Sequence, residues 1–388
     1  MEVNHSLLKG QRIALVANTD WYLWNYRLSL ANHLRETGSE VYLISPKGAY
    51  SKALQAHGFK WIEWQLNRRS IFPIWEIYSL VKLHRLYRQI QPDIVHHFTV
   101  KPVLYGSFVS NLLGVSYIFN SITGLGYFFL RDTLAIKMIR NLILWSYSFV
   151  LRKPNVYVIF ENQDDRSFFL ERNLANSENT FIIEGVGVDI HQFTPSAEPE
   201  GTPIILYAGR FLWEKGLGEL IEAARFLRGQ FDFRLVLVGN PDTGNPGSIS
   251  MNLIDEWVQE GIVEWWGWQD NMAEVYQKCH VVVLPSYREG IPTTLIEALA
   301  AQKPVIATDA PGCRDVVIPG VNGLLVPPRN PEALRDALAL LLSNRDLRID
   351  MGKAGREIAI DKFSKEVIDH KTIMLYHSIL MSNKKDER

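Results

Sequence analysis

Residues 281–302 read VVVLPSYREGIPTTLIEALAAQ and contain the transition that decides the fold. The run VVVLPS (281–286) is apolar and β-branched, which is typical of a buried strand. The loop YREGIP comes next, and TTLIEALAAQ then has the composition and spacing of a helix. A buried strand that leads through a short loop into a helix is the repeating unit of a parallel sheet covered by helices.

The same alternation of strands and helices extends along most of the chain. Apolar runs predict strands at 12–18, 40–46, 93–98, 115–123, 155–160 and 180–188, and again at 203–210, 233–240, 262–268, 281–286, 304–310 and 322–328. Between the two sets, HQFTPSAEPEGTP (191–203) lacks periodicity and indicates a linker. We therefore predict an α/β protein with two tandem Rossmann-like doubly wound domains that face a cleft. The expected domains are 1–192 and 193–365, with a C-terminal helix at 366–388 that packs back toward the first domain.

Size and composition are typical of a soluble globular protein with more than one domain. The chain has 388 residues, 47% of them hydrophobic and 21% charged. Its two cysteines, Cys279 and Cys313, are too few for a disulfide framework, which favours a reducing, cytoplasmic setting. No signal peptide is apparent, and no run reaches the roughly 18 apolar residues that a membrane span requires.

Positive charge is concentrated in the first half of the chain. Residues 60–153 contain twelve Lys and Arg but only four Asp and Glu, together with many aromatic and aliphatic residues. One interpretation is a set of amphipathic helices with solvated basic faces. The other is a surface for anionic lipid or for a phosphorylated acceptor, which would place the protein at the inner face of the plasma membrane. No nucleic-acid-binding module is recognisable, so no nucleic-acid partner is expected.

A second strand-to-helix turn has the residues of a phosphate site. In YAGRFLWEKGLGELIEAA (207–224), Gly209 lets the backbone approach a ligand, and Arg210 and Lys215 flank the turn. The N-terminus of the following helix offers N–H donors, so the turn suits a diphosphate. The alternative is an ordinary turn with two surface cations. No GxxxxGK[ST] or GxGxxG motif is present, which argues against an ATPase or a common dinucleotide-binding enzyme.

The opening stretch holds two carboxylates, Glu289 and Glu297, eight positions apart. The local alternative for Glu297 is a capping box, in which Thr294 caps the helix and Glu297 reaches back. Glu289 would then be a solvated loop acid. The functional interpretation is that N–H groups of residues 290–294 bind an anion while both acids accept hydrogen bonds from hydroxyl groups. Such a site fits a sugar joined to a phosphate and a ribose.

These motifs resemble those of retaining family 4-type glycosyltransferases, which have the GT-B fold. EGIPTTLIEA resembles their Glu-x7-Glu signature, and AGRFLWEKGLGELIEAA resembles their diphosphate-binding turn. EGVGVDIHQFTP resembles their interdomain segment, and KPVIATDAPGCRDVVIPGVNGLLVPP resembles the segment after the second Glu of the signature. FENQDDRSFF and SITGLGYFF are similar to segments of members that extend bacterial surface glycans or lipid-linked oligosaccharides. The resemblance extends over residues 11–365.

The resemblance implies roles for individual residues. Arg210 and Lys215 would bind the donor diphosphate and stabilise the leaving nucleotide. Glu289 would bind hydroxyls of the donor sugar, which completes the expected catalytic set, and Glu297 would bind the ribose hydroxyls. The remaining donor-binding residues would be Gly209, Gly267, Trp268, Gly290, Ile291, Pro292, Thr293 and Thr294.

The first domain departs from the family pattern. Many members have a Gly-Gly loop after the first strand, where this chain has NTDWYLWNYR (18–27), and many have a histidine where this chain has Thr123. The residues expected at the acceptor or cleft are Asn25, Arg27, His96, His97, Thr123 and Gly124. The alternatives are that the histidines are hydrogen-bonded core residues and that WYLWNYR supplies aromatic side chains for helix packing.

The resemblance implies retaining transfer of a sugar from a nucleotide-diphosphate sugar, with UDP-hexose or UDP-N-acetylhexosamine ahead of GDP-mannose. The acceptor would be a saccharide, with a polyprenyl-diphosphate-linked saccharide as the expected form, in bacterial polysaccharide, O-antigen or capsule biosynthesis. No Asp-x-Asp motif is present, so we expect a metal-independent reaction without a cofactor. The alternatives are a sugar-nucleotide epimerase or phosphorylase on the same scaffold, and a non-catalytic nucleotide-sugar-binding protein.

Overall fold

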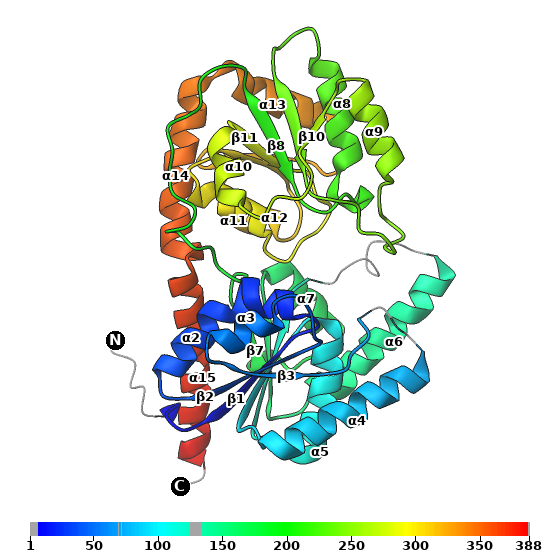
Figure 1. The fold of residues 1–388 in the computed structure, drawn as a ribbon, viewed down its shortest axis with the longest axis vertical. Coiled ribbons are helices and arrows are strands. Elements are labelled where there is room, and N and C mark those ends of the chain that lie inside the picture. The colour runs from blue at the N-terminus through cyan, green and yellow to red at the C-terminus, as the bar shows by residue number, and fades with distance from the viewer. Residues whose placement is uncertain (1–6, 69, 71, 125–132, 387–388) are drawn as a thin grey trace. The chain divides into compact units, whose positions relative to one another are not determined.

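The computed structural model describes residues 7–68, 70, 72–124 and 133–386. It divides into two compact units, which are coloured by residue number in Figure 1. The first unit comprises residues 1–186 and 368–388, and the second comprises residues 187–367. Each is a parallel sheet with helices on both faces, which confirms the predicted α/β fold class.

The first unit has a seven-stranded sheet in the order β3-β2-β1-β4-β5-β6-β7. Its strands are β1 (Arg12–Val16), β2 (Glu40–Ser45), β3 (Lys60–Glu63), β4 (Ile94–Phe98), β5 (Tyr117–Ile122), β6 (Val156–Phe160) and β7 (Thr180–Ile182). Alternate residues of β1 enter different cores, Ile13 and Leu15 on one face and Ala14 and Val16 on the other. Burial on both faces explains why most of these strands are continuous apolar runs.

Two groups of helices cover this sheet. The segments are α1 (Asp20–Tyr22), η2 (Leu23–Arg27), α2 (Leu28–Glu36), α3 (Ser51–Ala56), α4 (Pro73–Ile90), η3 (Pro102–Gly106), α5 (Ser107–Leu113), α6 (Leu134–Leu151), α7 (Gln163–Glu171), η5 (Ser177–Asn179) and α15 (Lys365–Asp386). Helices α4, α5 and α6 pack into one core, whereas α2, α3 and α15 pack into the other. Among the described residues, no helix is long and apolar enough to cross a membrane.

The second unit has a six-stranded sheet in the order β10-β9-β8-β11-β12-β13. Its strands are β8 (Ile204–Ala208), β9 (Arg234–Val238), β10 (Glu264–Trp265), β11 (Val281–Leu284), β12 (Val305–Thr308) and β13 (Gly323–Val326). Its helices are η6 (Trp213–Lys215), α8 (Leu217–Leu227), α9 (Met251–Gln259), α10 (Met272–Lys278), α11 (Thr293–Ala300), α12 (Cys313–Val316), α13 (Pro331–Ser343) and α14 (Arg345–Phe363). The strand order reverses between β8 and β11, and such a reversal is where open α/β sheets bind ligands.

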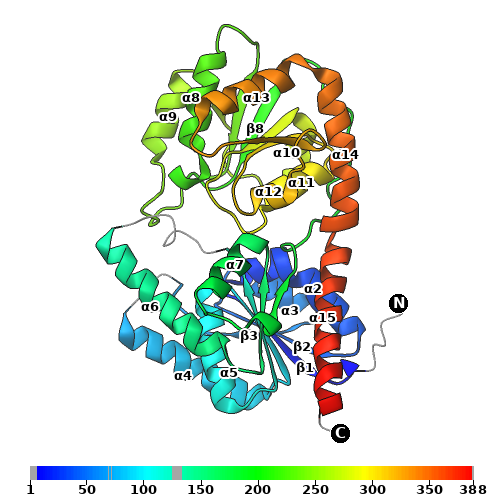
Figure 2. The ribbon, with the colours of Figure 1, turned by 180° about the vertical axis from the view of Figure 1, so that it is seen from behind.

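The end of the chain returns to the first unit. Helix α15 places Ile368, Tyr376 and Leu380 in the core that α2 also contacts. Asp369 of α15 accepts hydrogen bonds from α2, where Figure 2 shows the two helices side by side. The two segments that connect the units are paired, because Val188 N donates to Phe363 O (2.8 Å) and Lys365 N donates to Val188 O (3.0 Å).

Candidate active site

Three loops of the second unit meet at the carboxyl ends of neighbouring strands. The turn after β8 carries Arg210 and Lys215, and the loop after β11 carries Glu289. The loop after β12 leads into α12, and β11 pairs with both β8 and β12. The strand order therefore brings together the two motifs that the sequence predicts for donor binding.

Glycines allow these loops to touch backbone to backbone. A Cβ atom on Gly216 would lie 2.0 Å from the carbonyl oxygen of Pro285, and one on Gly312 would lie 2.0 Å from that of Gly290. Gly239, after β9, is equally close to the carbonyl oxygen of Gly209. Real Cβ contacts are never this short, so larger side chains at these positions would force the loops apart.

Lys215 and Glu289 form the central ion pair of this site. Lys215 Nζ donates a hydrogen bond to Glu289 Oε1, and the two side chains are only 17% and 13% exposed. The loop of Glu289 is held from both sides: Glu289 N donates to Pro311 O, and Tyr287 N donates to Glu214 O, each at 2.9 Å. A largely buried pair in a fixed backbone frame has a defined position before any ligand binds.

Arg210 pairs with a different acid. Its Nη1 donates to Asp242 Oδ2 at 2.8 Å, and its side chain is 52% exposed. The Tyr207 hydroxyl donates to Arg210 O at 2.9 Å, which fixes the turn. Burial raises the pKa of Tyr207, and after burial the largest contributions to this pKa come from the charges of Glu289 and Arg210. The Arg210 guanidinium itself is directed to Asp242.

The capping-box alternative for Glu297 is wrong. Pro292 is the N-cap of α11 and provides no side-chain hydrogen bond, and Thr294 lies inside the first turn. Thr294 Oγ1 donates instead to Ala208 O at 3.1 Å. Glu297 Oε2 accepts a hydrogen bond of 3.0 Å from Tyr276 Oη. Burial raises the pKa of Glu297 to about 7, although the Tyr276 hydroxyl opposes this shift.

The remaining predicted donor residues lie on these loops, except for Gly267 and Trp268, which lie on the loop after β10. Gly290 to Thr294 lead into the N-terminus of α11, where the first N–H groups have no partner within the helix. Gly267 has φ of +70° and accepts a hydrogen bond from Gly239 N at 2.9 Å. Trp268 is 57% exposed, and its indole N–H donates to Asp270 Oδ1 at 2.9 Å. The indole ring is thus an accessible flat surface beside the loop that follows β9.

The structure contradicts a cleft role for His96 and His97, which are fully buried in β4. Hydrogen bonds join His96 Nδ1 to the Tyr376 hydroxyl (2.5 Å) and its Nε2 to the Ser121 hydroxyl (2.8 Å). The rings have no accessible nitrogen because both nitrogens of His97 are also engaged, with Asn120 Oδ1 and Tyr87 Oη, each at 2.9 Å. Burial lowers the pKa of His97 to about 4 and that of His96 well below its usual value, so both are neutral core residues.

Other predicted residues of the first unit are also held by internal contacts. Arg27 is buried, its guanidinium lies 4.2 Å from the centroid of the Phe98 ring, and its Nη2 donates to Tyr22 Oη at 3.0 Å. This favours helix packing over acceptor binding for Arg27. The side chain of Asn25 donates to Trp21 O at 2.9 Å and is partly exposed.

Thr123 and Gly124 follow β5 and are partly exposed. The rest of the motif SITGLGYFF, from residue 125 on, lies outside the described residues. These two positions remain predicted acceptor residues, since neither is buried in the core.

Two residues of the site are not predicted from the sequence. Asp242 orients Arg210, and Tyr276 holds Glu297, but neither belongs to a motif. The only available signal for Asp242 is its place after a predicted strand, at the sheet edge where open α/β sheets bind ligands. Tyr276 gives no signal, because its role depends on the packing of α10 against α11.

Two family models match separate parts of the chain. The family described as "Glycosyl transferases group 1" matches residues 189–358, and "Glycosyl transferase 4-like" matches residues 12–153. A relative from Campylobacter jejuni subsp. jejuni serotype O:2 is named N,N'-diacetylbacillosaminyl-diphospho-undecaprenol alpha-1,3-N-acetylgalactosaminyltransferase. It is 26% identical over 383 residues, which is 95% of this chain and 99% of the relative.

Two further proteins are similar over most of the chain. The capsular polysaccharide biosynthesis glycosyltransferase CapM of Staphylococcus aureus is 24% identical, over 89% of this chain and 92% of its own. The structure of sucrose-phosphate synthase from Thermosynechococcus elongatus has a TM-score of 0.79 at 23% identity. That match covers 96% of this chain and 100% of the other. At this identity the structural likeness concerns the fold.

Proposed function

The chain belongs to the group 1 glycosyltransferases and has the GT-B fold, and we propose that it is a retaining hexosyl- or N-acetylhexosaminyltransferase. Its donor is a UDP-sugar, and its acceptor is a saccharide linked to polyprenyl diphosphate. The reaction is a step in the assembly of a bacterial surface polysaccharide. The C. jejuni relative supports this acceptor class, because its name specifies a diphospho-undecaprenol-linked sugar.

The observation that carries the proposal is the Lys215–Glu289 pair between the loops after β8 and β11. An ammonium group has three N–H donors, and the bond to Glu289 uses one of them. The others are available to a phosphate oxygen. When the anomeric C–O bond breaks, negative charge grows on the diphosphate, and a fixed cation at this point stabilises the transition state. Arg210 adds a second cation if the guanidinium turns from Asp242 toward the ligand.

The acidic side chains fit the hydroxyl groups of the same donor. Glu289 is oriented by Lys215, and its carboxylate accepts hydrogen bonds from sugar hydroxyls. Glu297, with a pKa of about 7, is only partly ionised at neutral pH. Two ribose hydroxyls that donate to its carboxylate would favour the ionised form, so donor binding and proton release from Glu297 would be coupled.

Retention is supported by the type of linkage that the relative makes. The name of the C. jejuni protein specifies an alpha-1,3 linkage, and retention from an α-linked nucleotide sugar gives an α-linked product. We also propose that the transfer needs no metal ion, because Lys215, the N-terminus of α11 and Arg210, once it turns from Asp242, supply positive charge around the expected diphosphate. Transfer at an unchanged rate in the presence of EDTA is the expected result.

The test is a panel of UDP- and GDP-sugars, first by thermal stabilisation and then with synthetic polyprenyl-diphosphate saccharides. A UDP-hexose or UDP-N-acetylhexosamine should stabilise the protein and yield an elongated lipid-linked product. NMR of the new glycosidic bond reports its anomeric configuration. A β-linked product from an α-linked donor would contradict retention. An epimerised donor in the absence of acceptor would support the epimerase alternative, and tight binding with no turnover on any acceptor would support a sensor.

A further inference from the structure

Helices α4, α5 and α6 cover one face of the sheet in the first unit, as Figure 1 shows. Their inner sides carry Leu83 and Tyr87 of α4, Val109 of α5 and Tyr147 and Leu151 of α6 into one core. Contact with the sheet accounts for these inner sides. The outer sides of the same helices have a composition that folding does not explain.

The outer side of α6 is apolar along its whole length. Leu134, Met138, Leu142, Trp145 and Phe149 recur every three or four residues, which places them on one stripe of the helix. Leu134 is 83% exposed and Trp145 is 64% exposed. Scattered exposed apolar residues are ordinary on a protein surface, but a continuous stripe of five marks an interaction site.

Helices α4 and α5 also have exposed apolar side chains on their outer sides. Ile74, Ile77 and Val81 form a stripe on the exposed side of α4, and Phe108 and Leu112 do so on α5. A groove of about 610 Å³ lies between the two helices and is lined by apolar residues of both. His84, Arg85 and Arg88 also line it, so the groove combines an apolar surface with cationic groups.

The charge on these helices is almost entirely positive. Lys82, Arg85 and Arg88 lie on α4, and Lys137 and Arg140 lie on α6. Within the three helices, in their described residues, the only carboxylate is Glu76. A surface with this composition repels another copy of itself but attracts anionic headgroups.

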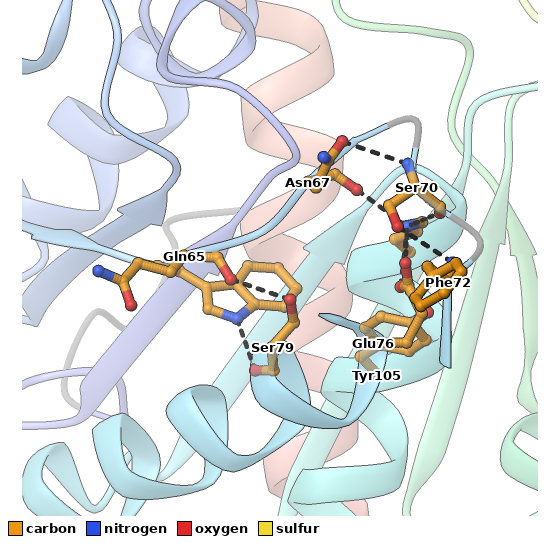
Figure 3. A network of polar contacts seen from close by, with 9 residues as sticks. Gln65, Asn67, Ser70, Phe72, Glu76, Ser79 and Tyr105 are labelled. Carbon is orange, nitrogen blue, oxygen red and sulfur yellow. Dashed lines mark hydrogen bonds and ion pairs between the residues drawn. The ribbon is translucent and has the colours of Figure 1, made fainter. Parts of the chain in front are cut away.

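The one carboxylate, Glu76, is neutralised by an intramolecular ion pair. Lys101 Nζ donates to both oxygens of Glu76, at 2.9 and 2.8 Å, and the Tyr105 hydroxyl donates to Glu76 Oε2. Figure 3 shows Glu76 and Tyr105 in this network, next to Phe72 and Ser70 at the start of α4. Lys101 also donates to the backbone oxygens of Asn67 and Ser70. Glu76 therefore does not oppose an anionic partner, and the network fixes the N-terminal turn that carries the exposed Ile74.

We propose that the outer surface of α4, α5 and α6, here called the α4–α6 surface, docks on an anionic lipid bilayer. Its apolar stripes enter the boundary between headgroups and acyl chains, and its Lys and Arg side chains contact lipid phosphates. This mode of attachment is interfacial. It adds a location to the proposed function, since a polyprenyl-linked acceptor resides in a membrane, but it does not depend on the donor or on the transfer reaction.

Sedimentation with vesicles tests the proposal without reference to activity. The full chain is mixed with vesicles of phosphatidylcholine alone or with phosphatidylglycerol added, at low and high salt. We expect binding to the anionic vesicles that weakens as salt rises. The double variant Met138→Asp/Leu142→Asp should bind at least about tenfold more weakly, because it removes two apolar groups from the docking stripe and adds negative charge. Leu340→Asp, at an exposed leucine of α13 in the second unit, is the matched control and should bind like the parent.

A second double variant, Lys82→Gln/Arg85→Gln, tests the contribution of positive charge and should bind anionic vesicles more weakly than the parent. Arg335→Gln, on α13 of the second unit, is its control and should bind like the parent. Unchanged melting temperatures verify that each variant is folded. The proposal is overturned if the parent does not sediment with anionic vesicles at low salt, or if Met138→Asp/Leu142→Asp binds as the parent does. It is also overturned if the parent is a dimer that this variant makes monomeric and neither form binds vesicles. Vesicle binding without transfer from any nucleotide sugar would instead refute the proposed function alone.

Discussion

Lys215 Nζ donates a hydrogen bond to Glu289 Oε1, although 74 positions separate the two residues in the sequence. The pair joins the turn after β8 to the loop after β11, at the point where the strand order reverses. Its neighbours Gly216 and Gly312 permit backbone contacts that a side chain would prevent. The cation that we assign to the diphosphate is thus positioned by the fold before the donor arrives.

Replacement of Lys215 by Ala should lower the transfer rate by about 10²-fold or more, because it removes a fixed cation from the site of developing charge. The measurement is kcat with the donor that the panel identifies. Lys278→Ala, at an exposed lysine of α10, is the control and should retain the parent rate. A folded Lys215→Ala variant with normal turnover would rule out the assigned role.

Arg210→Ala should slow transfer by a similar factor and leave stability almost unchanged. An ion pair whose arginine is half exposed contributes only about 0–1 kcal/mol to folding, so loss of the bond to Asp242 costs little. Chemical denaturation and steady-state kinetics measure the two effects separately. If the variant is clearly destabilised but transfers at the parent rate, Arg210 is a structural residue and not a donor ligand.

Glu297→Gln should stabilise the protein above pH 7. The folded-state pKa of Glu297 is raised to about 7, so between about pH 4.5 and pH 7 the folded state binds more protons than the unfolded state. The stability that this carboxyl contributes in its protonated form is therefore lost as pH rises through that window. Glutamine removes the loss and keeps an acceptor for Tyr276, which predicts a gain on the order of 1–3 kcal/mol at pH 8. Melting curves of both proteins should converge near pH 4.5.

The same variant should weaken donor binding, which separates function from stability. UDP affinity of the parent should rise with pH between 6 and 8, as Glu297 loses its proton and becomes a better acceptor for ribose hydroxyls. The affinity of Glu297→Gln should be lower at pH 8 and should keep only the pH dependence that ionisation of the terminal phosphate of UDP contributes. Titration calorimetry with UDP measures both. Equal affinity of the two proteins at pH 8 would exclude Glu297 from the nucleotide site.

Gly216→Ala should destabilise the protein by about 3 kcal/mol or more, because the new Cβ combines a positive φ with an overlap of the Pro285 oxygen. Gly320→Ala is the matched control, since Gly320 has a similar φ of +78° but no atom within 4 Å of the added Cβ. The control should lose only about 1–2 kcal/mol. Denaturant titration compares them, and equal losses would show that the contact between the two loops is not tight.

The strands were largely predictable, because burial on both faces leaves a run of apolar residues in the sequence. The exception is β3, Lys60–Glu63, which lies at the edge of the sheet and is half exposed, so it has no such run. The predicted strand 262–268 shrinks to Glu264–Trp265 for a similar reason, since β10 is also an edge strand. An edge strand forms backbone hydrogen bonds with a neighbouring strand on one side only, and it can be short.

Only the site residues that belong to sequence motifs could be predicted. Arg210, Lys215, Glu289 and Glu297 stand in or just beyond loops that follow strands, and parallel topology brings such loops together. Local patterns were misleading at Thr294-x-x-Glu297, where the capping signature is overridden by contacts with Ala208 and Tyr276. These partners are distant in sequence, and no periodicity encodes them.

The pairing of Val188 with Phe363 and Lys365 has a practical consequence for protein production. The second unit is a contiguous insertion whose first and last segments are hydrogen-bonded to each other, so we expect residues 187–367 to fold as a separate fragment. The first unit is split by that insertion. A fragment that stops at residue 186 would lack Tyr376, leaving a hole beside His96 and one of its hydrogen bonds unmade. To recover the first unit alone, α15 must be rejoined to residue 186 through a short artificial linker.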